Sequence, residues 1–204
     1  IQARAGSYED YFAAIAKDND WVVSGLLSRG FDPKTPNEKG INGILMALSL
    51  GNLKVAKVLI ETKGAPIDER NENDETPLMI ASIKGYLELA KLLIDKGADV
   101  NKPGWTPLHY AASKGNIEMI RLLLEENAYI DAASPNGTTP LMMAAGYSSN
   151  PLASKVLLEE GADPTLINDK DLSAADFARK EKQSETEQLI LAYAKVWRDK
   201  EKQK

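Results

Sequence analysis

The sequence predicts an all-α solenoid of about six helix-turn-helix repeats, each with a short β-hairpin finger. A Thr-Pro-Leu motif recurs at Thr76, Thr106 and Thr139, and paired small residues and an apolar triplet follow it each time. The motif returns at intervals of 30 and 33 residues, which indicates stacked structural repeats. One such unit is too small to bury its own apolar face, so neighbouring copies must stack against each other.

The repeats follow one another along nearly the whole chain. With the Pro of Thr-Pro-Leu as the marker, the equivalent positions are residues 43, 77, 107, 140 and 174. We expect these segments in order: an N-terminal remnant at 1–6, an N-terminal capping repeat at 7–36, repeats at 37–70, 71–100, 101–133 and 134–167, and a C-terminal capping repeat with an extended helix at 168–204. The finger of the repeat at 101–133 is three residues shorter than the others, which leaves a notch beside Trp105.

Within each repeat, the residue types suit a pair of short helices. Thr is a preferred N-cap, and Pro fits the first helical turn, where a missing N–H costs nothing. Gly85 and Gly115 are expected to end the first helices with positive φ. The segment from Gly146 to Pro151 is one residue longer than its counterparts, so we expect a distorted turn there.

The composition excludes several classes of function. The net charge is −5 and evenly spread, which argues against a generic nucleic-acid binder or a membrane-surface protein. With no Cys and a single His, thiolate and multi-histidine metal sites are excluded, and we expect no metal or cofactor. The longest uncharged run, residues 132–154, contains several Pro and Gly residues and could not span a bilayer as a helix.

The most specific string is Thr106 to Ala112, which reads Thr-Pro-Leu-His-Tyr-Ala-Ala, with Gly115-Asn116 downstream. It resembles the ankyrin repeat, and Ser134 to Gly137 is similar to bacterial members of that family. The resemblance implies a non-catalytic module that binds a partner protein. It also implies a structural role for His109, because the His of this motif usually bonds backbone between neighbouring repeats.

The resemblance places the partner surface on the finger tips and on the concave face of the first helices. The matching positions are Glu38, Lys39, Ile41, Leu50, Glu72, Asn73, Glu75, Ile83, Lys84, Trp105, Ser113, Lys114, Asn136, Thr138 and Tyr147. Trp105 has two interpretations: a hot spot for the partner, or a side chain that covers its own hairpin. We assign Tyr110, Met142 and Met143 to core packing.

Other functions and the location of the protein stay open at this stage. An enzyme or small-ligand binder would need converging polar groups in the concave groove, and the sequence shows no phosphate-binding loop or nucleophile elbow. The chain starts at Ile1, so an upstream segment is expected, and Ala3-Arg4-Ala5 has the pattern of a signal-peptidase site. This motif favours a periplasmic or secreted protein, with the cytoplasm as the alternative. We expect a monomer.

Overall fold

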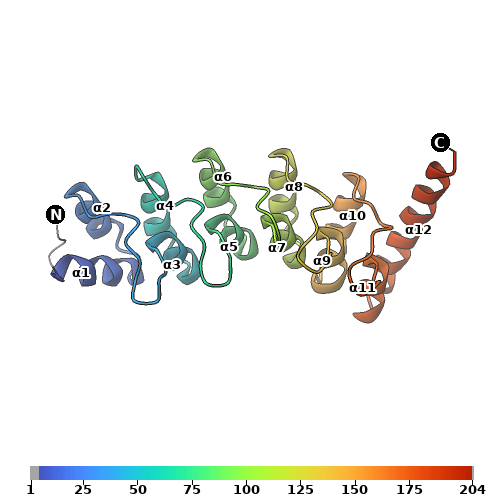
Figure 1. Cartoon of the computed structure of the whole chain (residues 1–204), viewed down its shortest axis with the longest axis horizontal. Coiled ribbons are helices and arrows are strands. Elements are labelled where there is room, and N and C mark those ends of the chain that lie inside the picture. Colours follow the sequence, from blue (N-terminus) through green and yellow to red (C-terminus); the bar gives the residue numbers. More distant parts are fainter. Residues whose placement is uncertain (1–4, 204) are drawn as a thin grey trace. The chain divides into compact units, whose positions relative to one another are not determined.

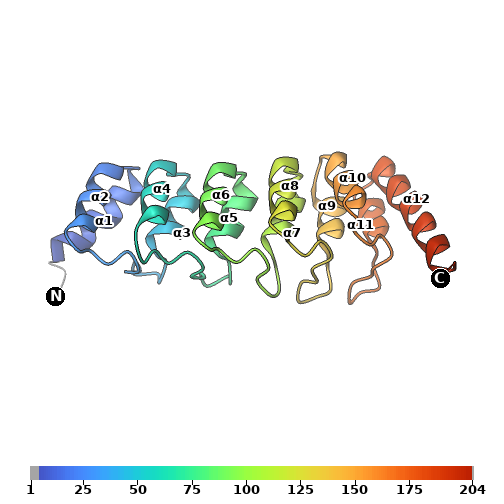
Figure 2. The ribbon, with the colours of Figure 1, turned by 90° about the horizontal axis from the view of Figure 1, so that it is seen from above.

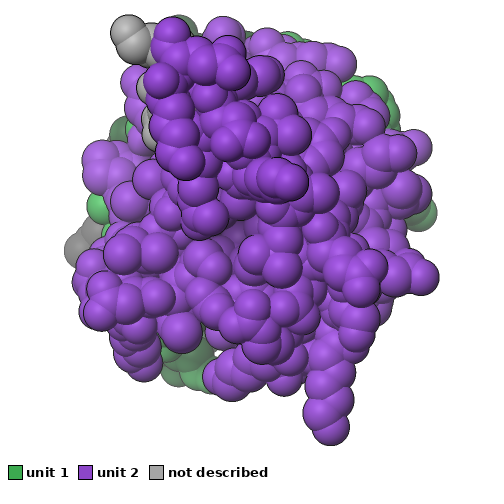
Figure 3. Space-filling view, turned by 90° about the vertical axis from the view of Figure 1, so that its right-hand side faces the viewer, with its two compact units in different colours: residues 1–99 green, residues 100–204 purple. Residues whose placement is uncertain are grey.

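The computed structural model describes residues 5–203, and the chain divides into two compact units, residues 1–99 and residues 100–204, which are coloured separately in Figure 3. The N-terminal unit is called unit 1 below, and the C-terminal one unit 2. The remnant expected at 1–6 and the Ala3-Arg4-Ala5 motif lie mostly outside the described residues. The first helix begins at Ala5, two residues before the capping repeat that the sequence predicts.

Unit 1 consists of three helix pairs arranged in two layers (Figure 1). The helices are α1 (Ala5–Ala16), α2 (Asp20–Ser28), α3 (Gly43–Leu50), α4 (Leu53–Glu61), α5 (Pro77–Lys84) and α6 (Leu87–Asp95). In one layer α3 packs between α1 and α5, and in the other α4 packs between α2 and α6. The first helix of each pair therefore contacts the first helices of its neighbours, and the second helix contacts the second.

Unit 2 repeats this arrangement. Its helices are α7 (Pro107–Lys114), α8 (Ile117–Glu125), α9 (Pro140–Tyr147), α10 (Pro151–Glu159), α11 (Ala174–Lys180) and α12 (Ser184–Glu201). The first helices α7, α9 and α11 form one layer, and α10 packs between α8 and α12 in the other. The apolar triplets supply the core, since Leu93 in unit 1 and Leu123 in unit 2 are fully buried.

The helix ends are built as the sequence predicts. The hydroxyls of Thr76, Thr106 and Thr139 each accept the backbone N–H of the third helical residue, and that residue's side chain accepts the N–H of the Thr in return. Different side chains make this return bond: Met79 accepts through its sulfur, and His109 accepts through its Nδ1 atom. Each of these three repeats thus satisfies two backbone donors that would otherwise be left unpaired at the start of a helix.

The predicted all-α class is confirmed, and the fingers are turns rather than regular hairpins. Among residues 5–203 no strand forms, and one isolated antiparallel bridge pairs Ile167 with Ser173. Asn side chains hold several fingers: Oδ1 of Asn37 accepts two backbone N–H groups, and Asn168 does the same in unit 2. Within each unit the finger loops extend to one side of the helices (Figure 2).

The turns between the paired helices separate into two types. Gly85 and Gly115 have the predicted positive φ of 76° and 64°. After α9 the corresponding residue is Ser148, which is extended, so the predicted distortion is confirmed. Two hydrogen bonds join this turn to other parts of unit 2: Gln183 Nε2 donates to the Ser148 carbonyl, and Asn150 Nδ2 donates to the Gly115 carbonyl.

Candidate functional site

The finger at 37–41 and the first helices α1 and α3 line an open, mostly apolar cavity of about 430 Å³ in unit 1. Four residues of the predicted partner surface line it, namely Glu38, Lys39, Ile41 and Leu50. The other lining residues are Tyr8, Phe12, Asn37, Met46 and Ser49. Leu50 is 55% exposed at the end of α3, where the packing of the repeats does not need a large apolar side chain.

A second cavity, of about 290 Å³, lies in unit 2 between the fingers and the helices α9 and α11; it is called the unit 2 groove below. Its lining residues are Trp105, Asn136, Thr138, Met143, Tyr147, Asn168, Lys170, Leu172, Asp176, Phe177 and Lys180. Tyr147 is 65% exposed, and its ring lies 6.4 Å from the ring of Phe177. The groove therefore combines aromatic surface with polar and charged side chains.

Trp105 packs against its own repeat and also lines two cavities. Its ring meets the ring of His109 edge to face at 5.2 Å, so it covers its own repeat. The half-buried side chain also lines the unit 2 groove and an adjoining cavity of about 220 Å³ that His109, Tyr110 and Met143 border. Local packing thus fixes the ring in place while part of its surface stays accessible.

His109 is held in the interior by hydrogen bonds at both ring nitrogens. Its Nδ1 accepts the N–H of Thr106, and its Nε2 donates to the carbonyl of Thr138 at 2.9 Å. Burial lowers the pKa of His109, which favours the neutral ring. Although His109 borders a cavity, neither nitrogen is free to act as a base, so the structural role that the sequence implies is the one the geometry supports.

The carboxylate in the unit 2 groove is also engaged. One oxygen of Asp176 accepts the N–H and the hydroxyl of Ser173, and the other pairs with Arg179 at 2.8 Å. The Ser173 hydrogen bonds are the main reason that the pKa of Asp176 is lowered, and Arg179 adds to this. Asp176 is therefore an ionised helix cap rather than a candidate acid or base.

Three side chains lie differently from the prediction. Thr138 is 2% exposed, because its N–H and carbonyl are bonded within the fold, so it contributes little side-chain surface to a partner. Tyr110 and Met143 are only partly buried and border a cavity, whereas Met142 is buried as predicted. The remaining predicted residues lie outside both cavities, on fingers and helix ends: Glu72, Asn73, Glu75, Ile83, Lys84, Ser113 and Lys114.

Sequence reasoning missed one side of the unit 2 groove. Phe177 lies three residues after the marker position 174, as Met143 does after 140, and the helical period places this position on the same face as the exposed helix end. Lys170 and Lys180 belong to the last repeat, which the sequence analysis treats only as a cap. Applying the register of the predicted surface to residues 168–180 would have identified Lys170 and Lys180, which match Asn136 and Ser113. It would have assigned Phe177 to the core, as it did its equivalent Met143.

The described residues hold no group of three or more His, Asp or Glu side chains that could bind a metal ion. None of the helices between residues 5 and 203 combines the length and the apolar content needed to cross a membrane.

Comparison with known proteins identifies the repeats. The family model for ankyrin repeats (3 copies) matches residues 11–103 and 101–168. Ankyrin repeat and SAM domain-containing protein 6 from Rattus norvegicus is 37% identical over 144 residues. That match covers 71% of this chain but only 13% of the rat protein.

Two solved bacterial structures share the fold over most of the chain. An ankyrin repeat domain from Acinetobacter baumannii superimposes with a TM-score of 0.78 at 27% identity, covering 89% of this chain and 95% of the other. A chain from the structure of a predatory endopeptidase of Bdellovibrio bacteriovorus in complex with an immunity protein also gives 0.78, at 26% identity and with 94% and 99% covered. With its repeats, its capped helix pairs and these matches, the chain belongs to the ankyrin-repeat family.

Proposed function

We propose that this protein is a non-catalytic module that binds a partner protein through its fingers and first helices. The observation that carries the proposal is the position of its exposed apolar side chains. Leu50 and Tyr147 end first helices in the two units, each beside a cavity, at places where the repeat scaffold does not require them. Exposed apolar surface bordered by charge is typical of protein interfaces.

The comparisons support the same conclusion. Members of this family serve as protein-interaction modules, and one of the two bacterial structures is a complex of two proteins. A stacked scaffold also suits binding physically, because a rigid surface loses little conformational entropy when a partner docks. Among the described residues, His109 and Asp176 are both engaged in bonds within the fold, so neither side chain supports an enzymatic role. We propose that the monomer is the binding species.

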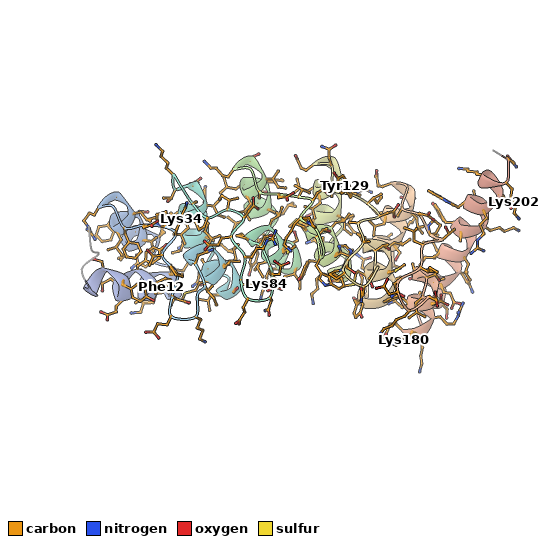
Figure 4. All side chains as sticks on the ribbon, viewed as in Figure 1. Phe12, Lys34, Lys84, Tyr129, Lys180 and Lys202 are labelled. Carbon is orange, nitrogen blue, oxygen red and sulfur yellow. The ribbon has the colours of Figure 1, made fainter. Side chains whose placement is uncertain are left out.

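Capture of partners by the purified protein tests this proposal with matched variants. Tyr147→Arg changes an exposed tyrosine beside the unit 2 groove, and Tyr129→Arg makes the same change at a tyrosine of similar exposure, 68%, on the loop after α8 (Figure 4). Leu50→Arg and Leu152→Arg form a second pair, since Leu152 is 54% exposed on α10. We expect Tyr147→Arg or Leu50→Arg to lower the amount of partner captured by about tenfold or more.

The two control variants show whether any loss of binding is specific to the proposed surface. Tyr129→Arg and Leu152→Arg should retain the partner at the level of the unchanged protein. If a specifically captured protein is lost equally with the control variants, or is insensitive to both Tyr147→Arg and Leu50→Arg, the binding surface lies elsewhere. Thermal unfolding of each variant establishes that the fold is intact.

A further inference from the structure

The floor of the unit 2 groove is apolar. Trp105, Met143, Leu172 and Phe177 line it, and the exposed ring of Tyr147 adds to its edge. Since aromatic side chains bury large areas at little cost in side-chain entropy, this floor suits a bulky apolar side chain of a ligand.

The polar groups of the groove include amide donors that the fold leaves unused. The Asn168 side chain is only 7% exposed, and its Oδ1 accepts the N–H groups of Lys170 and Leu172. Its Nδ2 has no acceptor among the described residues, although the side chain lines the groove. Asn136 is arranged similarly, because its Oδ1 accepts from Ser134 and Thr138 while its Nδ2 makes no bond within the described part of the chain. A nearly buried amide without an acceptor indicates a place for a ligand oxygen.

The charged groups point to the same kind of ligand. Lys170 lies on the finger and Lys180 is the last residue of α11, and neither forms an ion pair with any described residue. The carboxylate that lines the groove, Asp176, is already engaged by Ser173 and Arg179. In a chain with a net charge of −5, this groove therefore presents free cations and amide donors without a free carboxylate. The finger also carries Asp169 and Asp171, which are not among the groove-lining residues.

We infer that the unit 2 groove binds an acidic segment of a partner protein in which Asp or Glu residues flank a bulky apolar side chain. This inference rests on the proposed function and names the chemistry of the partner. The apolar side chain packs on Trp105 and Phe177, and ligand carboxylates pair with Lys170 and Lys180. The two lysines line the groove from different elements, Lys170 from the finger and Lys180 from the end of α11. A ligand that pairs with both therefore needs more than one carboxylate, which favours an internal acidic segment over a single C-terminal carboxylate.

Binding of defined fluorescent peptides to the full chain, followed by anisotropy, tests the inference. The probe peptide is GDEWEDG, and its matched partners are GNQWQNG, which lacks the charges, and GDEAEDG, which lacks the aromatic ring. We expect the probe to bind at least about tenfold more tightly than either partner, with an affinity that falls as salt is added. The double variant K170E/K180E should bind the probe peptide more weakly by at least the same factor.

The control variant K195E/K200E makes the same change in charge on α12, where both lysines are exposed. It should bind the probe as the unchanged protein does. Equal affinity for GDEWEDG and GNQWQNG, absence of binding by the probe at about 1 mM, or equal losses in the two double variants would each overturn the inference. If partner capture still depends on Tyr147 in any of these cases, the proposed function stands and only the acidic specificity is wrong.

Discussion

The Nε2 atom of His109 donates a hydrogen bond to the carbonyl of Thr138, 2.9 Å away in the next repeat. The same ring accepts the N–H of Thr106 through Nδ1 and supports the edge of Trp105. One neutral side chain thus caps its own helix, anchors the following finger and orients an aromatic ring beside the groove. Protonation would convert the Nδ1 acceptor into a donor facing another donor.

Stability should therefore fall in acid through His109. Burial lowers its folded-state pKa below the ordinary value, so the unfolded chain binds more protons as the pH drops. This contribution to stability is fully present above the unfolded pKa of about 6.5 and is lost as the pH falls below it. Urea unfolding from pH 7.5 to pH 5 should show a steeper loss for the unchanged protein than for His109→Gln. Parallel pH profiles would show that His109 does not titrate in this way.

Asp131→Asn should stabilise the protein near neutral pH. Asp131 accepts the N–H of Asp163, and burial raises the pKa of Asp131, with the Asp163 carboxylate adding to that effect. A raised folded-state pKa means that stability declines as the pH rises through the titration, so the uncharged amide should gain about 0.5 kcal/mol at pH 7. The gain should vanish near pH 3, where Asp131 is itself protonated.

The chain contains the natural counterpart of that substitution. Asn101 holds the equivalent place, with Oδ1 accepting the N–H of Tyr129 and Nδ2 donating to the Asn127 carbonyl. Asn101→Asp is therefore the reverse control, and it should cost about 1 kcal/mol or more because a carboxylate would face that carbonyl. Equal effects of the two substitutions would contradict the argument.

Two glycines within helices should respond oppositely to alanine. A Cβ atom at Gly146 would lie 2.7 Å from Cδ1 of Phe177, so Gly146→Ala should destabilise unit 2 by about 1–3 kcal/mol. At Gly25 the nearest atom would be 3.9 Å away, and Gly25→Ala should stabilise α2 by up to about 1 kcal/mol through helix propensity. Chemical denaturation of the pair measures both effects, and a gain at Gly146 would refute the close contact.

Removal of one hydroxyl should stabilise unit 1. The ring of Tyr11 is fully buried and stacks on Phe31, but its hydroxyl has no hydrogen-bond partner among the described residues. Burial raises the pKa of this phenol, so it remains neutral. Tyr11→Phe retains the stacking and should raise the free energy of unfolding by about 1 kcal/mol. The exposed Tyr129→Phe serves as the control, and a loss of stability at Tyr11 would mean that the hydroxyl is bonded.

Trp105→Ala should separate the two roles of that side chain. Loss of the edge-to-face contact with His109 should lower the free energy of unfolding by about 1 kcal/mol. Loss of the accessible ring should weaken the binding of the partner by at least about 2 kcal/mol. Trp105→Phe retains much of the contact and should show smaller changes in both. Stability from denaturation and affinity from titration of the folded protein provide the two readouts. An unchanged affinity would assign Trp105 to the scaffold alone.

The sequence was sufficient for the fold because the decisive signals are local. The Thr of each Thr-Pro-Leu motif caps the helix that follows it, and Gly115 turns the chain by its own φ. The extra residue after Gly146 likewise predicts the distorted turn. The partners that stabilise this turn, such as Gln183, lie far along the chain.

The unit 2 groove was only partly predictable for the same reason. Whether Thr138 is accessible depends on the imidazole of His109 in the preceding repeat, and the exposure of Met143 depends on the finger that follows. The sequence alone did not predict a binding role for Lys170 and Lys180, because charged residues in a terminal repeat usually serve solubility. Their lack of ion pairs is visible only in three dimensions.

The turn at Ser148 has a consequence for how unit 2 comes apart. Its carbonyl is bound by Gln183 ahead of α12, while Asn150 is bound to Gly115 at the end of α7. Stacked arrays commonly fray one layer at a time from an end. Here the unfolding of α12 would break the Gln183 bond to the turn between α9 and α10. That turn is itself bonded to the end of α7 through Asn150. Amide protons along these six helices should therefore exchange in a single concerted opening.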